Sequence, residues 1–126
     1  MFETGLAYAP PGWPGEVPPP GAPEWEVRAT AYLLDCCPAD FRAYRVLRNH
    51  PVVLAQFARH FVQGQSQAAQ EGLAAVRTGL QDFVEPGVLE EATQAWLEQA
   101  ARLARTRRAV ALVEAVLRGT TFVPKM

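Results

Sequence analysis

Two long stretches without proline constrain the fold more than any other feature of this chain. No proline lies between Pro51 and Pro86, and none follows until Pro124. A proline is tolerated at the first position of a helix, because its missing N–H has no acceptor within the helix. The pattern therefore predicts two long helices, over residues 51–82 and 86–118, joined by the short turn "VEPG".

The spacing of apolar residues supports the second long helix. Nine positions recur at intervals of three or four residues, and seven of them are apolar. They are Leu89, Ala92, Trp96, Gln99, Leu103, Thr106, Val110, Val113 and Leu117. Such spacing places one stripe on one face of a helix. We expect this face to pack along a partner helix. Arg118 followed by Gly119 is a typical C-terminal signal and predicts where the second long helix ends.

A comparable stripe in the first long helix has small residues at its middle. It comprises Phe57, Phe61, Gly64, Ala68, Gly72, Ala75, Gly79 and Phe83. Small residues let two helix backbones approach closely, although each glycine inside a helix costs ~1 kcal/mol relative to alanine. We expect the two stripes to face each other in an antiparallel hairpin about 48 Å long, at ~1.5 Å per residue.

The same proline rule predicts two shorter helices before the hairpin, over residues 24–36 and 39–49. They are too short to cover the whole hairpin, so we expect a second copy to cover the rest and to give a homodimer. The candidate dimer or core residues are Phe57, Phe61, Trp96, Leu103 and Val110. The fold class predicted is all-α.

The N-terminal residues have a different composition. Residues 1–23 hold seven of the eleven prolines and four glycines, with almost no periodic apolar pattern. This composition predicts a disordered tail before a single domain over residues 24–119, which a short C-terminal tail, residues 120–126, follows. Alternatively, "PPGWPGEVPPP" could dock as a polyproline ligand in an aromatic groove.

The net charge of −1 hides a strong segregation of charge along the chain. Residues 1–40 and 61–101 each carry a net charge of −5, whereas residues 41–60 carry +4 and residues 102–126 carry +5. The hairpin register brings the two basic blocks to its open end. We expect a binding surface there for a protein partner or another anion, built from Arg42, Arg45, Arg48, Arg59, Arg105 and Arg108.

Three interpretations of the arginines stay open. They can pair with acidic side chains of a protein partner, contact nucleic-acid phosphates, or be neutralised by acids of the same chain. The slightly acidic total favours a protein partner over nucleic acid. We therefore expect an interaction or scaffold module, and the alternative is a nucleic-acid-associated accessory protein that uses the basic end.

The cysteines and histidines do not have the spacing of a metal site. Cys36 and Cys37 are adjacent, and His50 and His60 are ten positions apart, whereas zinc ligands pair at two to five positions. Packing roles are expected instead: the cysteines at a helix end, His50 as a helix cap, and His60 half-buried beside the core. No metal ligand and no cofactor are predicted.

The sequence contains no motif of an enzyme. It has no glycine-rich phosphate loop and no recognisable nucleophile motif, and its single serine lies inside a predicted helix. No window approaches ~20 uninterrupted apolar residues, and the N-terminus is acidic and proline-rich instead of apolar. We expect a cytoplasmic, non-enzymatic protein that does not enter a membrane.

One resemblance covers residues 24–124. The run "YLLDCCPADFRAYRVLRNHPVVLAQFARH", together with "VALVEAVLRG", resembles a group of short, uncharacterised helical proteins from high-GC bacteria. The resemblance implies an all-helical fold and brings no function with it.

Overall fold

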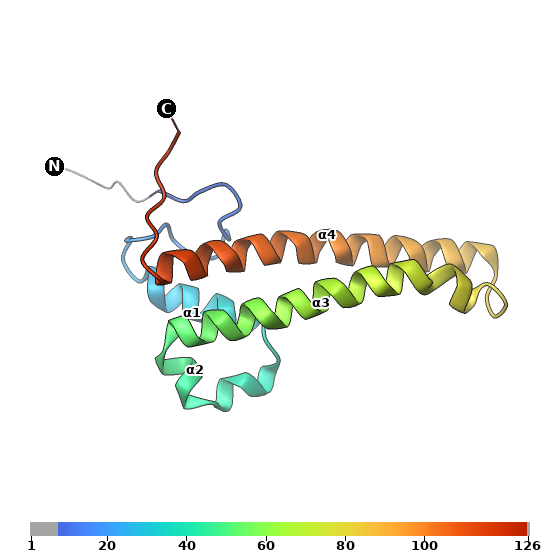
Figure 1. The fold of residues 1–126 in the computed structure, drawn as a ribbon, viewed down its shortest axis with the longest axis horizontal. Coiled ribbons are helices and arrows are strands. Elements are labelled where there is room, and N and C mark those ends of the chain that lie inside the picture. The colour runs from blue at the N-terminus through green and yellow to red at the C-terminus, as the bar shows by residue number, and fades with distance from the viewer. Residues whose placement is uncertain (1–7, 126) are drawn as a thin grey trace.

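A computed structural model describes residues 8–125, and the regular structure within that range is entirely helical (Figure 1). Helix α3, Pro51–Leu80, and helix α4, Pro86–Leu117, run side by side as a long antiparallel hairpin. Each begins at its proline, as expected from the missing N–H. The all-α fold with a long helical hairpin is therefore confirmed.

Helix α4 ends at a glycine. Gly119 has φ 105°, and its N–H donates to the Val116 carbonyl at 2.9 Å. The Thr120 N–H donates to the Ala115 carbonyl, also at 2.9 Å. This pair of bonds satisfies the last carbonyls of a helix and needs a left-handed residue, which glycine supplies without steric cost.

Two shorter elements precede the hairpin. Helix α1 spans Trp25–Asp35, close to its predicted range. The predicted helix over residues 39–49 is instead divided at Tyr44, which is extended with φ −86° and ψ 112°, into a 3₁₀ helix, η1, and the α-helix α2. They span Ala39–Ala43 and Arg45–Asn49.

The division at Tyr44 lets two apolar side chains reach the core. Leu47 is fully buried, and Phe41 packs against the core from η1. One straight helix would place these residues about 120° apart, so only one of them could face α3. Burial of both side chains accounts for the break.

The core lies in the half of the hairpin next to α1 and α2 (Figure 1). Its large, fully buried side chains are Leu33, Leu47, Leu54, Val62, Val110 and Val113. The core cluster includes no residue between 70 and 102. Toward the turn, therefore, α3 and α4 pack only on each other, and we call this part the distal half of the hairpin.

The small-residue stripe of α3 does not face α4 as predicted. A Cβ at Gly64 or Gly79 would meet no atom within 4 Å, and only Gly72 contacts α4, where a Cβ would lie 2.6 Å from Cη2 of Trp96. The neighbouring face packs inward instead, through Ala55, Ala58, Val62, Ser66, Ala69 and Val76. This face has the same helical period, and it buries the branched side chains of Val62 and Val76, whereas a glycine has no side chain to bury.

The candidate dimer and core residues fall into two groups. Leu103 and Val110 are buried within the chain, so they belong to its own core. Trp96 and Phe61 are half-buried, whereas Phe57 is 45% exposed. Only Phe57 and the exposed edge of Phe61 are therefore available to a second molecule near the start of α3.

The proline-rich N-terminal segment packs on the domain. Residues 8–23 contain no helix or strand, yet Val17 is only 3% exposed and belongs to the core. The indole N–H of Trp13 donates to the carbonyls of Val17 at 3.0 Å and Pro18 at 3.2 Å. Its ring centroid lies 6.3 Å from that of Trp25. The prediction of a separate disordered tail is thus wrong for residues 8–23, because two apolar side chains anchor the segment; residues 1–7 lie outside the described residues.

Candidate functional site

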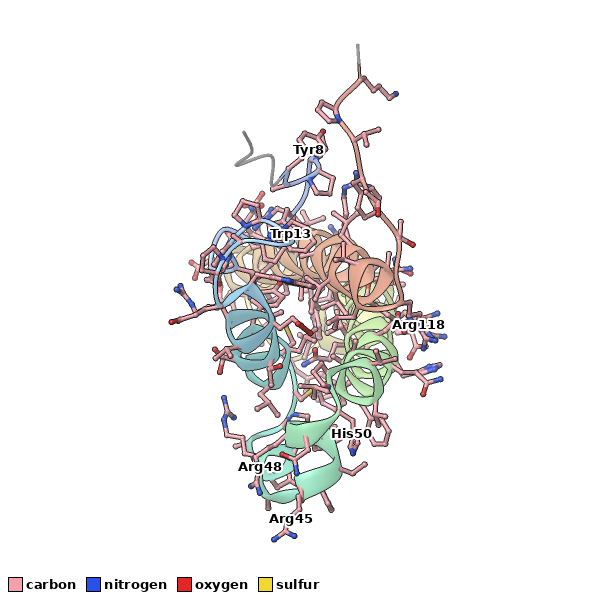
Figure 2. The ribbon with its side chains drawn as sticks, turned by 90° about the vertical axis from the view of Figure 1, so that its left-hand side faces the viewer. Tyr8, Trp13, Arg45, Arg48, His50 and Arg118 are labelled. Atoms are coloured by element: carbon pink, nitrogen blue, oxygen red, sulfur yellow. The ribbon has the colours of Figure 1, made fainter. Side chains whose placement is uncertain are left out.

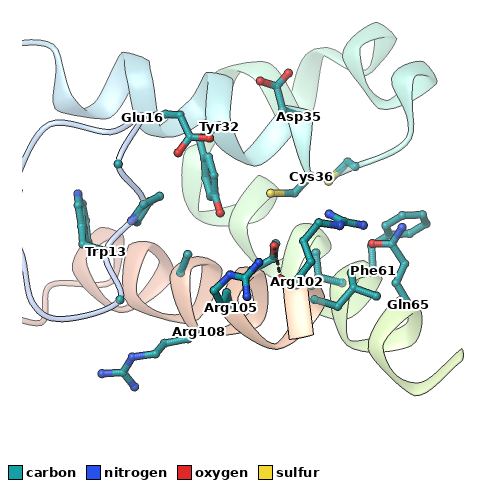
Figure 3. A pocket seen from close by; sticks show the side chains of 18 of the residues that line it. Trp13, Glu16, Tyr32, Asp35, Cys36, Phe61, Gln65, Arg102, Arg105 and Arg108 are labelled. Atoms are coloured by element: carbon teal, nitrogen blue, oxygen red, sulfur yellow. Dashed lines mark hydrogen bonds between the residues drawn. The ribbon is translucent and has the colours of Figure 1, made fainter. Parts of the chain in front are cut away.

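A groove of about 910 Å³ lies between α1 and α4 (Figure 3). Phe61, Val62 and Gln65 of α3 contribute to its lining, and the N-terminal segment lines it through residues 12–16. The groove exists because α1 and α4 both lie against α3 with space left between them. We call it the α1–α4 groove.

Arginines of α4 form one wall of this groove. Arg102 and Arg105 face Tyr32 of α1, and Cys36 directly after α1, across it (Figure 3). Arg102 donates from Nη2 to Oε1 of Gln99, one turn earlier, at 2.9 Å. Within residues 8–125, neither arginine forms an ion pair with a carboxylate. Both guanidinium groups therefore keep donors for a ligand.

Arg108, one turn after Arg105, has a different role. Its Nε donates to the carbonyl of Pro11 at 3.1 Å, which holds the N-terminal segment against α4. Gly12 has φ 95°, and a Cβ there would lie 2.7 Å from Cδ of Arg108. Glycine is thus favoured here by its backbone conformation, and a larger residue would also displace the Arg108 side chain.

The opposite side of the groove is acidic. Glu16 of the N-terminal segment and Asp35, the last residue of α1, both line it. Asp35 pairs with Arg42, whereas Glu16 forms no ion pair among the described residues. The α1–α4 groove therefore presents a basic wall opposite an acidic rim. A ligand with one concentrated negative charge would be attracted to the arginine wall and repelled by the carboxylates of the rim.

Tyr32 and Cys36 add uncharged polar groups to the groove. Burial is the main cause that raises the pKa of the Tyr32 hydroxyl, and the neighbouring Cys36 raises it further. Burial also raises the pKa of the Cys36 thiol, although its hydrogen bond to Tyr32 acts in the opposite direction. Both groups are consequently protonated at neutral pH, so the Cys36 thiol is a poor nucleophile there.

The six predicted arginines do not form one surface. Arg105 and Arg108 line the groove, but Arg45 and Arg48 project from α2 at the far side of the molecule from Trp13 (Figure 2). Arg42 is neutralised by Asp35 of the same chain. The elements that carry these arginines lie in the same half of the molecule, but the arginines are distributed over several faces of it.

Arg59 belongs to an internal ion-pair cluster. Its Nε donates to Oε1 of Glu114 at 2.6 Å, and Nε of Arg118 donates to Oε2 at 3.1 Å. Glu114 is only 6% exposed, so its charge needs these partners. The sequence predicts Arg59 as part of a basic surface and does not identify Glu114 of α4 as its partner.

The histidines have different environments from those expected. His60 is exposed, not half-buried, and His50 stands before α3 without a side-chain capping bond. Among residues 8–125, no three His, Cys, Asp or Glu side chains are grouped to hold a metal ion. In the same part of the chain, no helix has the length and apolar character needed to cross a bilayer.

His60 borders a second, smaller pocket of about 450 Å³. Phe41, Gln56, Phe57 and Phe61 complete its lining, and we call it the aromatic pocket. The ring centroid of Phe41 lies 6.2 Å from that of Phe57 and 6.0 Å from that of Phe61, at steep interplanar angles. The first pair is edge-to-face and the second is tilted, and the hollow beside them is lined by all three rings, so another aromatic ring could pack there.

Comparison with known proteins assigns no role to either site. No protein-family model matches the chain, and no curated protein sequence or solved structure matches it. The function is therefore argued from the side chains of the two sites alone.

Proposed function

We propose that this chain is a non-enzymatic, cytoplasmic interaction module that binds an acidic segment of a protein partner in the α1–α4 groove. One observation carries the proposal. Arg102 and Arg105 line the groove without a carboxylate partner, although Arg42, Arg59 and Arg118 each have one. A guanidinium group offers several N–H donors in a planar fork that matches a carboxylate.

The rest of the groove suits a peptide. Trp13 and Phe61 supply apolar surface, and the Tyr32 hydroxyl and Gln65 amide supply hydrogen-bonding groups for a peptide backbone. A partner with one acidic side chain beside an apolar one would use all of these features. We infer that the acidic side chain lies against α4 and away from Glu16 and Asp35.

Nucleic acid is disfavoured by the same distribution of charge. A phosphate backbone presents a negative charge at every nucleotide, so a binding protein needs a continuous basic track. The groove instead has Glu16 and Asp35 on its rim, and Arg45 and Arg48 lie on another face. A single acidic side chain can avoid the acidic rim, whereas a strand with repeating charge cannot.

The test compares two arginines of α4. Arg105 lines the groove, whereas Arg107 is also exposed but does not line it. A photo-crosslinking residue at Thr106 would first identify the partner in a host-cell extract. Calorimetry with the purified partner should then show that Arg105→Glu weakens binding at least about tenfold, or 1.4 kcal/mol, because it places two carboxylates together.

The control Arg107→Glu should leave that affinity unchanged within a factor of two. Equal losses in both variants would contradict a specific groove and would indicate general attraction between opposite charges. Binding to DNA or RNA at about 150 mM salt, with an affinity that falls steeply as salt increases, would favour the nucleic-acid alternative instead.

A further inference from the structure

The turn between α3 and α4 carries an exposed aromatic side chain among acids. Phe83 is 82% exposed, more than any other large apolar side chain in the described range. Residues 82–91 contain Asp82, Glu85, Glu90 and Glu91 and no basic residue. Covering this phenyl ring with another apolar surface would remove its apolar area from water, which is favourable.

A surface of the opposite character lies at the other end of the hairpin. The aromatic pocket is formed within residues 41–61, and residues 41–60 carry four arginines and no acid. Tyr44, whose ring centroid is 6.2 Å from that of Phe41, is directly followed by Arg45. An apolar hollow is thus accompanied by positive charge, as the exposed Phe83 is accompanied by negative charge.

We propose that two copies of this chain pair antiparallel, so that Phe83 of each copy enters the aromatic pocket of the other. The contact joins a phenyl ring to a hollow lined by three phenyl rings, and it sets an acidic segment against a basic one. Because each copy supplies both a ring and a pocket, a twofold axis makes the two contacts together and closes the assembly at two copies.

The surface between the two contacts allows this approach. Phe57, Gly64, Ala68, Ala75 and Gly79 share one side of α3 at helical spacing. All five are exposed, and Gly64 and Gly79 have open space where a Cβ would lie. A second α3 can therefore run close along this side for about 35 Å, the length of 23 helical residues.

Charge excludes the other pairings of the same surfaces. Parallel hairpins, or two turns in contact, would place the four acids of residues 82–91 against the same four acids. Antiparallel hairpins place them against Arg45 and Arg48 of the second copy. They also cover the distal half of the hairpin, where α1 and α2 do not reach.

This pairing does not rest on the proposed function. Phe61 lines both the aromatic pocket and the α1–α4 groove, but Phe83 and the arginines of α2 do not line the groove, so a change at Phe83 leaves its basic wall in place. A variant at Phe83 therefore separates failure of the pairing from failure of partner binding.

Sedimentation equilibrium tests the ring and pocket. The wild-type chain should approach twice its mass of 13.8 kDa at micromolar concentration, and Phe83→Ser should shift the dimer dissociation constant upward at least about thirtyfold. Val27→Ser is the control, because Val27 is another exposed apolar residue and lies on α1. A monomeric wild-type chain, or an unchanged dimer in Phe83→Ser, would overturn the proposal.

A charge exchange tests the antiparallel arrangement directly. One variant carries Glu90→Arg and Glu91→Arg, and the other carries Arg45→Glu and Arg48→Glu; circular dichroism verifies that each folds. Each variant alone should dimerise less tightly than the wild-type chain, because the substituted positions of each copy then meet residues of the same charge in the other. An equimolar mixture should form a tighter heterodimer than either variant forms with itself, since the substituted positions then meet residues of opposite charge. A mixture that pairs no more tightly than the separate variants would refute the antiparallel pairing.

Discussion

Replacing each glycine of α3 by alanine should have opposite effects at different positions. At Gly72, the added Cβ would lie 2.5 Å from Cε2 and 2.6 Å from Cη2 of Trp96, inside the van der Waals limit. At Gly64 and Gly79, it would meet nothing within 4 Å. The same chemical change in the same helix therefore differs only in what the new methyl group contacts.

The expected magnitudes follow from two opposing terms. Alanine inside a helix is more stable than glycine by about 1 kcal/mol, so Gly64→Ala and Gly79→Ala should each stabilise the chain by about that amount. Gly72→Ala gains the same term but forces the half-buried indole aside, and overpacking costs ~1–3 kcal/mol. The net effect at Gly72 should lie between about zero and 2 kcal/mol of destabilisation.

Urea unfolding followed by far-ultraviolet circular dichroism measures these differences. A Phe83→Ser background removes any contribution of pairing between copies. In a thermal melt of the same variants, each kcal/mol of change in the free energy of unfolding should move the melting temperature by roughly 3–6 °C for a domain of this size. Trp96→Phe should relieve the penalty at Gly72, because a phenyl ring lacks the atoms that overlap. If Gly72→Ala stabilised the chain as much as Gly64→Ala, the close contact with Trp96 would be refuted.

Three further predictions concern the core and its ion pairs. Arg59→Ala should lower the free energy of unfolding by about 1–2 kcal/mol, because the buried carboxylate of Glu114 then keeps only Arg118 as a partner. Urea unfolding measures this difference, and an unchanged free energy of unfolding would contradict the role of Arg59. Val17→Ala should cost about 1–2 kcal/mol in the same assay, whereas the exposed Val27→Ala should cost under 0.5 kcal/mol. Burial raises the pKa of the Cys37 thiol from 9.0 to about 11, so between these two pH values the thiol loses its proton only in the unfolded chain. The free energy of unfolding should therefore fall as the pH rises from 9 to 11. In Cys37→Ala the fall should be less steep.

The helices could be predicted from sequence because their signals are local. Pro51, Pro86 and Gly119 act through their own backbone conformations, so the bounds of α3 and α4 agree with expectation within two residues. The division of residues 39–49 at Tyr44 could not be found in this way. It results from the burial of Phe41 and Leu47 against α3, which only the folded chain brings about.

The packed face of α3 shows a second limit of sequence patterns. Two stripes with the same helical period run along this helix, and periodicity cannot decide between them. The small-residue stripe was predicted to face α4, but Gly64 and Gly79 have open space where a Cβ would lie. The stripe through Val62 and Val76 is the buried one. The side of α3 left exposed is the one on which our proposed pairing depends.

The α1–α4 groove could not be predicted, because its lining comes from segments that are distant in sequence. The N-terminal segment looked like a disordered tail by composition, and only Val17 and Trp13 attach it to the core. Its contact with α4 then depends on Arg108, which the sequence predicts only as part of a basic binding surface. The attached segment closes one end of the groove, in which Arg102 and Arg105 line the wall without a carboxylate partner among residues 8–125. The charge pattern of the sequence therefore becomes a site only once this segment packs against α4.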